Sequence, residues 1–185
     1  MRTLIVYGTR YGATASTSEE IAKLLGEEGF DVKVVNAKKE KIKDISQYDL
    51  IVVGSGMQMG RWTGETEDFL KKFQNDLPHK KVAIFVSSMK SVPEREGKQD
   101  ELEKARKIDL DDKVAKYGLN PVAIGFFGGV LDFNKMNVIT RRTFGFVKPQ
   151  LEKDGFKESP SGVYDLRDWK EIRGWAKELS SKARQ

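Results

Sequence analysis

The chain of 185 residues contains no cysteine, one histidine and no apolar stretch as long as a membrane span. The lack of cysteine excludes disulfides, thiolate metal sites, iron–sulfur clusters and cysteine nucleophiles. The single histidine, His79, lies in the polar stretch "LPHKK" between a helical and a strand pattern, and we interpret it as an exposed loop residue. One such residue supports neither a histidine metal site nor a catalytic triad. Any redox chemistry therefore needs a bound organic cofactor.

The sequence also lacks a charged leader followed by an apolar segment, so we expect a cytoplasmic protein. Its length and 38% hydrophobic content are typical of one globular domain, here spanning residues 1–185. The 33 basic and 28 acidic residues leave a net charge of +5. This mild bias permits anionic partners but identifies none, and we expect no nucleic acid among them. The oligomeric state stays open.

Apolar runs separated by helical patterns organise the chain. The runs are "TLIVY" (3–7), "DVKVVN" (31–36), "DLIVVG" (49–54), "KVAIFVS" (81–87) and "PVAIGFF" (121–127). The second run alternates and contains Lys33, as an edge strand would. Helical patterns occur near residues 21–25, 69–73, 102–108 and 166–179. The alternation of strand and helix patterns along the chain predicts an α/β fold with a doubly wound parallel sheet.

The stretch "GTRYGATAST" (8–17) links the first strand to the first helix. Free backbone N–H groups at a helix start, together with the hydroxyls of Thr9 and Thr14, suit a phosphate monoester. The loop lacks the lysine of a nucleoside-triphosphate loop. The second strand ends in Asn36 rather than in the acidic residue of a dinucleotide site. Both of those nucleotide classes are therefore disfavoured.

Two further loops come after strands at the edge where ligands bind in such sheets: "GSGMQMGRW" (54–62) and "SSMKSVP" (87–93). Both contain small or hydroxylated residues that let the backbone approach a ligand. Trp62 has two interpretations: packing within the loop, or an aromatic wall against a flat ring.

These three loops, in this order, resemble those of the flavodoxin superfamily. The resemblance implies a five-stranded sheet of order 2-1-3-4-5 with helices on both faces, and FMN as cofactor. The family's phosphate loop typically reads Thr/Ser-x-Thr-Gly-x-Thr. This sequence matches it at residues 9–14 and departs at Tyr11, where a third hydroxyl residue is usual. Arg10 fills a variable position but is unusual, because the family commonly binds the phosphate without a nearby positive charge.

The resemblance also implies which residues hold the cofactor. The phosphate set is Thr9, Arg10, Tyr11, Gly12, Ala13 and Thr14. One side of the flavin would meet Gly56, Met57, Gln58, Met59, Gly60, Arg61 and Trp62. The other side would meet Ser87, Ser88, Met89 and Lys90. No acid–base pair is identified.

Within the superfamily, "IGFFGGVLDFNKMNVITR" and "YDLRDWKEIRGWA" resemble the menaquinone-dependent protoporphyrinogen IX dehydrogenase branch. That branch implies oxidation of protoporphyrinogen IX or a similar ring substrate, with a quinone as acceptor. An extra basic amphipathic helical segment at about 132–155 then offers Lys135, Arg141 and Arg142 to substrate carboxylates. The same segment could rest peripherally on the inner face of a membrane, or pack its apolar stripe on the domain with its cations solvated.

Two other function classes remain open. A soluble flavodoxin-type electron carrier would exchange electrons with a redox partner protein and have no substrate pocket. A flavin-free binding module would take up no FMN.

Overall fold

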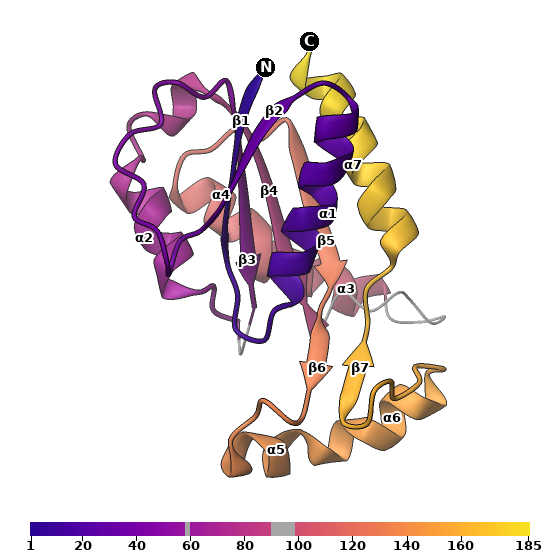
Figure 1. Cartoon of the computed structure of the whole chain (residues 1–185). Helices are drawn as coiled ribbons and strands as arrows, with labels where there is room; N and C mark the ends of the chain where they lie inside the picture. The colour runs from indigo at the N-terminus through magenta and orange to yellow at the C-terminus, as the bar shows by residue number, and fades with distance from the viewer. Residues whose placement is uncertain (58–59, 90–98) are drawn as a thin grey trace.

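The five apolar runs form one parallel sheet in the computed structural model, which describes residues 1–57, 60–89 and 99–185. The strands are β1 (Arg2–Gly8), β2 (Asp31–Asn36), β3 (Leu50–Gly56), β4 (Lys81–Ser88) and β5 (Ala123–Gly128). Their order is β2-β1-β3-β4-β5, which confirms the predicted order and the edge position of residues 31–36 (Figure 1). Their carboxyl ends therefore share one edge of the sheet.

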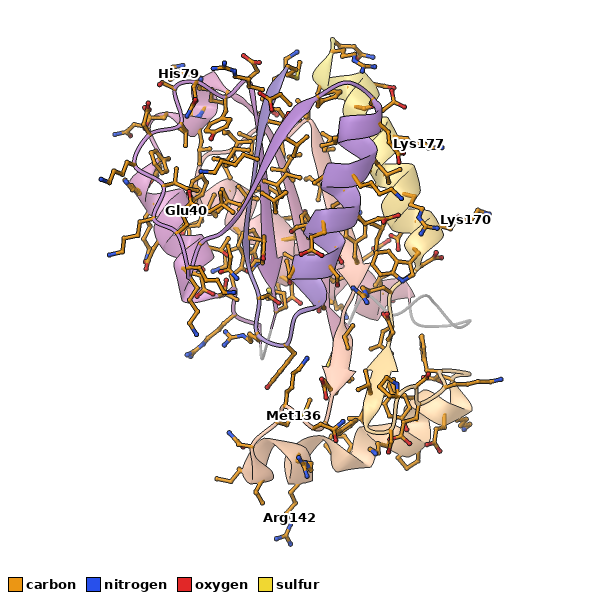
Figure 2. All side chains as sticks on the ribbon, viewed as in Figure 1. Glu40, His79, Met136, Arg142, Lys170 and Lys177 are labelled. Carbon is orange, nitrogen blue, oxygen red and sulfur yellow. The ribbon has the colours of Figure 1, made fainter. Side chains whose placement is uncertain are left out.

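Helices cover both faces of the sheet. α1 (Ala13–Glu27) and α7 (Trp169–Ala183) lie side by side on one face, and α2 (Gly64–Lys72) covers the other (Figure 1). The alternation of side chains along β1 builds both layers: Leu4 joins the buried cluster of Phe69, whereas Ile5 joins the cluster of Ile21. A 3₁₀ turn (Leu77–His79) precedes β4 and leaves His79 exposed, as expected (Figure 2).

The chain between β4 and β5 forms α3 (Gln99–Arg106), a π-helical turn (Lys107–Asp111) and α4 (Asp112–Lys116). The helical spacing around residue 102 predicts Ile108 on the buried stripe, but Ile108 is 54% exposed and Asp109 is buried. The wider π turn accounts for this difference, because it inserts one residue into the helical repeat and rotates the residues after it about the helix axis.

A two-stranded antiparallel ribbon extends beyond the carboxyl edge of the sheet, and the sequence patterns do not predict it. It pairs β6 (Val130–Asp132) with β7 (Val163–Asp165). The helical segment that it supports consists of α5 (Val138–Phe144), a 3₁₀ turn (Gly145–Val147) and α6 (Lys148–Lys153), instead of one helix over 132–155 (Figure 1). This segment has a small core of its own, formed by Leu131, Phe133, Met136, Leu151, Tyr164 and Leu166.

The stripe expected in this segment is only partly buried. Met136 is 7% exposed and Val147 packs against the small core, but Ile139 and Phe146 are 80% and 76% exposed. The helical segment is too short and too interrupted to turn all of its apolar residues to one side. This corrects the alternative in which the whole stripe packs on the domain.

α7 carries the buried stripe that the sequence predicts, with Trp175 and Leu179 in the core. It begins at Trp169, a little later than residue 166, because the Asp168 carboxylate accepts hydrogen bonds from the N–H groups of Lys170 and Glu171 and caps the helix. Within the described parts of the chain, no helix combines the length and apolar character needed to span a membrane.

Candidate functional site

The turn from β1 into α1 has the geometry of an anion site. Gly12 is the N-cap of α1 at φ 99°, and among described residues no side chain caps the helix. The Gly12 N–H donates to Thr9 Oγ1 over 2.9 Å, and no acidic residue lies in the first turn. Thr14 is 1% exposed beside the free helical N–H groups. The helix dipole and these groups therefore favour a negative charge at this end of the helix.

The second loop lies against the first. A Cβ atom built on Gly56 would lie 3.2 Å from Thr14 Oγ1 and 3.6 Å from the Arg10 backbone nitrogen. A larger residue at position 56 would therefore push the two loops apart. The Met57 N–H donates to the Ser87 carbonyl over 2.9 Å, which joins the second loop to the third.

All three loops line one cavity of about 260 Å³ at the carboxyl edge of the sheet. From the predicted set, the lining includes Thr9, Arg10, Tyr11, Ala13, Thr14, Gly56, Met57, Gly60, Ser87, Ser88 and Met89. Thr9 and Thr14 bring hydroxyls from the first loop, Ser87 and Ser88 bring them from the third, and methionines supply apolar walls. Gly12 shapes the first loop without lining the cavity. Gln58, Met59 and Lys90 lie outside the described residues.

Trp62 and Arg61 do not line this cavity. Trp62 is 3% exposed in the core, where its indole Nε1 donates to the Asp109 backbone carbonyl over 2.6 Å. This corrects the expectation of an aromatic wall. The Trp62 indole lies in the core, where its one polar atom has a buried hydrogen-bond acceptor. Arg10 donates to the Trp62 carbonyl over 3.5 Å. Arg61 is exposed at the protein surface.

The cavity also contains residues that the sequence patterns do not single out. These are Asp109 from the π-helical turn and Gly129, Val130 and Leu131 from the start of the ribbon. Met136, which the sequence places on the apolar stripe of residues 132–155, lines the cavity too. Asp109 is 1% exposed, and its Oδ2 accepts a hydrogen bond from Ser88 Oγ over 3.4 Å. No local pattern in "KIDLDD" distinguishes this aspartate from its neighbours. Met136 carried a weak signal as an apolar residue between Lys135 and Asn137.

The three predicted substrate cations differ in position. Lys135 reaches the site: its Nζ donates to the Tyr11 carbonyl over 3.4 Å and pairs with Asp132 Oδ2 at 3.1 Å. Arg141 donates to the Phe133 carbonyl over 2.9 Å, and Arg142 points away from the sheet (Figure 2). Neither arginine lines the cavity, so the structure brings only Lys135 to its first loop.

Asp132 anchors this contact. Burial opposes its ionisation, but the Lys135 ammonium and the Asn134 N–H outweigh burial and hold the pKa of Asp132 below its ordinary value. The Asp132 carboxylate is therefore ionised near neutral pH, and its contact with Lys135 ties the ribbon to the first loop.

Apolar side chains protrude from the segment beyond the ribbon. Val138, Ile139 and Phe146 are 81%, 80% and 76% exposed, and we call them the α5 surface. Arg141 and Arg142 are exposed on the same helix. Large exposed apolar side chains grouped within nine residues, 138–146, are typical of an interaction surface.

Comparison with known proteins agrees with this geometry. The family model described as "Flavodoxin domain" matches residues 4–158. Protoporphyrinogen IX dehydrogenase [quinone] of Escherichia coli K12 is 23% identical over 181 residues, which cover 97% of this chain and 95% of that protein. A flavodoxin from the domain Archaea has a TM-score of 0.56 at 17% identity and 100% coverage of both chains. A short-chain flavodoxin associated with a bacterial microcompartment has a TM-score of 0.59 at 16% identity, covering 99% of each chain.

Proposed function

The chain belongs to the flavodoxin domain family, and on that premise we propose that its cavity binds FMN and that the protein is an FMN-dependent oxidoreductase. One observation carries the proposal: three loops from separate strand ends enclose a cavity with an anion-binding helix start at one end. The methionine-lined remainder suits a flat ring. The residues present therefore fit a phosphate monoester joined to a planar apolar group.

Each part of the cavity has a distinct task in this proposal. The N–H groups of α1, with Thr9 and Thr14, hold the phosphate, and Arg10 adds a positive charge anchored on the Trp62 carbonyl. Met57 and Met89 contact the ring and exclude water from it. The flavin, when bound, supplies the electron transfer. Ser87 and Ser88 offer hydroxyls that orient the ring edge by hydrogen bonding.

We propose protoporphyrinogen IX or a similar ring as the substrate class, with a quinone as acceptor. Support comes from the relative named for that reaction, which aligns along nearly the whole chain. It also comes from Lys135, which contacts the first loop, and from the exposed arginines of α5. A flat apolar substrate with carboxylates would find the methionine-lined cavity and these cations beyond the same edge of the sheet.

We further propose that the α5 surface contacts a membrane peripherally, close to a quinone pool. Exposed apolar residues beside arginines are the composition that anionic lipid surfaces bind.

Co-sedimentation with phosphatidylglycerol vesicles, compared with phosphatidylcholine vesicles, tests this membrane contact. The triple variant V138S/I139S/F146S should weaken binding about tenfold or more. The control I108S removes another exposed apolar side chain, 54% exposed, from the π-helical turn. Equal binding by the triple variant and the control would refute the contact.

The absorption spectrum of the purified protein, with identification of the released chromophore, tests cofactor binding. Protein that shows no flavin, even after incubation with FMN, would overturn the proposal. A flavin that exchanges single electrons with a partner protein but oxidises no ring substrate would favour the electron-carrier alternative.

The substrate role is tested separately with the double variant R141Q/R142Q. We expect turnover of protoporphyrinogen to fall about tenfold while FMN content stays the same, because charged contacts to carboxylates are lost and the cavity is untouched. The matched control K170Q/K177Q removes two charges from α7, away from α5 (Figure 2). Unchanged turnover in R141Q/R142Q would count against the substrate role of these arginines.

A further inference from the structure

The guanidinium of Arg167 is held between the ribbon and the first turn of α1. Its side chain is 9% exposed, although arginine is an exposed residue in most folds. Nε and Nη2 donate to the two oxygens of the Asp165 carboxylate over 2.8 and 2.6 Å, and the Trp169 ring lies 4.3 Å from the guanidinium carbon. Nη1 reaches α1, where it lies 2.5 Å from Ser16 Oγ and 3.4 Å from the Ala13 carbonyl oxygen. Arg167 therefore links the end of β7 to α1.

A close approach of backbones places Arg167 beside α1. A Cβ atom built on Gly128, at the end of β5, would lie 2.0 Å from the Leu166 carbonyl oxygen and 2.9 Å from Arg167 Cα. Any larger residue at position 128 would therefore clash with the chain that crosses there. The Leu166 N–H also donates to the Gly129 carbonyl over 2.9 Å. The backbone thus fixes where the Arg167 side chain begins, and Asp165 fixes where its guanidinium lies.

The contacts of Arg167 fall on the peptide units at the start of α1. Ser16 Oγ lies 3.4 Å from the Gly12 carbonyl oxygen and 3.2 Å from that of Ala13, and its hydroxyl can donate to either. In a planar trans peptide unit, the carbonyl and the N–H of the next residue point in opposite directions. These next N–H groups belong to Ala13 and Thr14, and N–H groups of a first turn have no partner within the helix. Arg167 and Ser16 therefore fix the direction of N–H groups that the phosphate would use.

Arg167 also brings a positive charge to the positive end of the α1 dipole. Such a charge is unfavourable at a helix N-terminus, and the first turn contains no acidic residue that would offset it. Asp165 offsets part of the charge from outside the helix, through Nε and Nη2. An anion bound at this helix end would interact favourably with both the N–H groups and the guanidinium. The arrangement is therefore most favourable when the cavity contains an anion.

We propose that Arg167 is a positioning residue for the phosphate of FMN. The inference rests on the proposed FMN binding. Arg167 does not line the cavity, so it acts through Ser16 and the Ala13 carbonyl, which hold the first turn of α1 in the conformation that presents its N–H groups to the phosphate. Riboflavin is FMN without the phosphate, so its binding should gain nothing from Arg167.

Dissociation constants of FMN and of riboflavin, measured by flavin fluorescence with the full chain, test the proposal. We expect Arg167→Gln to weaken FMN binding about tenfold and to leave riboflavin binding within about twofold, because one charge-assisted hydrogen bond that supports only the phosphate is lost. A general loosening of the fold would weaken both flavins alike. Equal losses for the two flavins, or no loss for either, would overturn the role of Arg167.

Arg173→Gln is the matched control, because Arg173 also connects α7 to α1. It pairs with Glu20 at 2.6 Å, farther along α1 from the phosphate loop. The control should leave the preference for FMN over riboflavin unchanged, and an equal fall in this preference would contradict the proposal.

Ser16→Ala removes the hydroxyl that connects Arg167 to the carbonyls of α1. It should also lower the preference for FMN, and the double variant with Arg167→Gln should lose less than the product of the two single losses, because both act on one contact. Should Arg167→Gln fail to fold, Ser16→Ala provides the comparison of FMN with riboflavin. A multiplicative loss in the double variant would overturn the connection through Ser16.

Two outcomes in the wild type separate this inference from the proposed function. If riboflavin does not bind measurably, the inhibition constant of inorganic phosphate against FMN is measured instead. That constant should rise about tenfold in Arg167→Gln, and an unchanged constant would overturn the role of Arg167. Failure of the wild-type protein to bind FMN would overturn the proposed function itself.

Discussion

The indole Nε1 of Trp62 donates a hydrogen bond to the backbone carbonyl of Asp109 over 2.6 Å, so the second loop is tied to the π-helical turn behind the third. Both residues are almost fully buried, at 3% and 1% exposure. Removing one partner of such a bond destabilises the fold by more than the net contribution of the bond to stability. The reason is that the other partner stays buried without a hydrogen bond.

Replacing Trp62 by phenylalanine should therefore destabilise the fold by more than the loss of ring volume alone. Trp175→Phe is the matched control, because the Trp175 indole nitrogen is buried without a hydrogen-bond partner among the described residues. We expect Trp62→Phe to cost about 1 kcal/mol more in the free energy of unfolding, measured in urea. Equal losses in the two variants would mean that the hydrogen bond contributes nothing.

Gly12 should tolerate no other residue without cost, although space is available around it. A Cβ atom at Gly12 would meet nothing within 4 Å, but φ is 99° there. Gly12→Ala should lower the free energy of unfolding by about 1–2 kcal/mol through backbone strain. It should also weaken the proposed binding of FMN in a fluorescence titration, because the loop carries Thr9 and Thr14.

Gly26→Ala provides the control for that change within the same helix. Its Cβ also meets nothing within 4 Å, and its backbone is not left-handed. We expect it to stabilise the protein by up to about 1 kcal/mol, because alanine loses less conformational freedom in a helix. If Gly12→Ala also stabilised the protein, the left-handed conformation would not be required.

Acid should weaken the contact between α2 and α4 through Glu67 and Lys113, which form an ion pair. Burial favours the neutral acid, but the hydrogen bond and charge of Lys113 outweigh it and lower the pKa of Glu67 below its usual 4.5. A lowered pKa means that the stabilisation is present above about 4.5 and is lost as pH falls through the lower folded value.

Glu67→Gln should thus cost about 1 kcal/mol or less at neutral pH and show a smaller loss of stability on acidification than wild type. Urea unfolding at neutral and acid pH measures both effects. Glu65→Gln serves as the control on the same helix turn, since no ion pair joins Glu65 to any residue within the described ranges. Identical acid profiles for Glu67→Gln and wild type would contradict the prediction.

Alkali should act on the ribbon through Tyr164. Burial and the hydrogen bond from its hydroxyl to Glu152, 2.8 Å long, raise the pKa of Tyr164 to about 12. The neutral phenol is favoured in the fold, so this contribution is complete below the ordinary value of 10 and is lost as pH rises toward 12.

Phenolate absorbance is followed against pH in the wild type and in Tyr164→Phe. The difference between the two curves should report the Tyr164 phenol alone, with a midpoint near 12. Circular dichroism recorded in parallel shows whether the fold persists over the titration. A midpoint near 10 with the fold intact would mean that Tyr164 is accessible to water.

Much of the architecture was predictable because it depends on local patterns. The apolar runs that became β1, β3, β4 and β5 are continuous because such strands are covered on both faces, and Lys33 identified the edge strand β2. In a parallel sheet the strand ends share one edge, so the loops after β1, β3 and β4 could be assigned to one site.

Other features of the fold were not predicted, because short or irregular segments show little hydrophobic periodicity. β6 and β7 are three residues each, too short for alternation to show. The π turn that buries Asp109 changes the helical repeat at a point where "KIDLDD" offers no signal. The exposed α5 surface has the same composition as a packed stripe, and only its surroundings distinguish the two.

The sequence by itself determined the parallel strands, the glycine- and hydroxyl-rich start of α1 and the grouping of three loops, because strand burial and loop chemistry depend on neighbouring residues along the chain. Only the tertiary structure decided that Trp62 turns into the core and that Asp109 faces the cavity. Both orientations depend on a hydrogen bond between segments 47 residues apart, and local sequence patterns do not encode such long-range contacts.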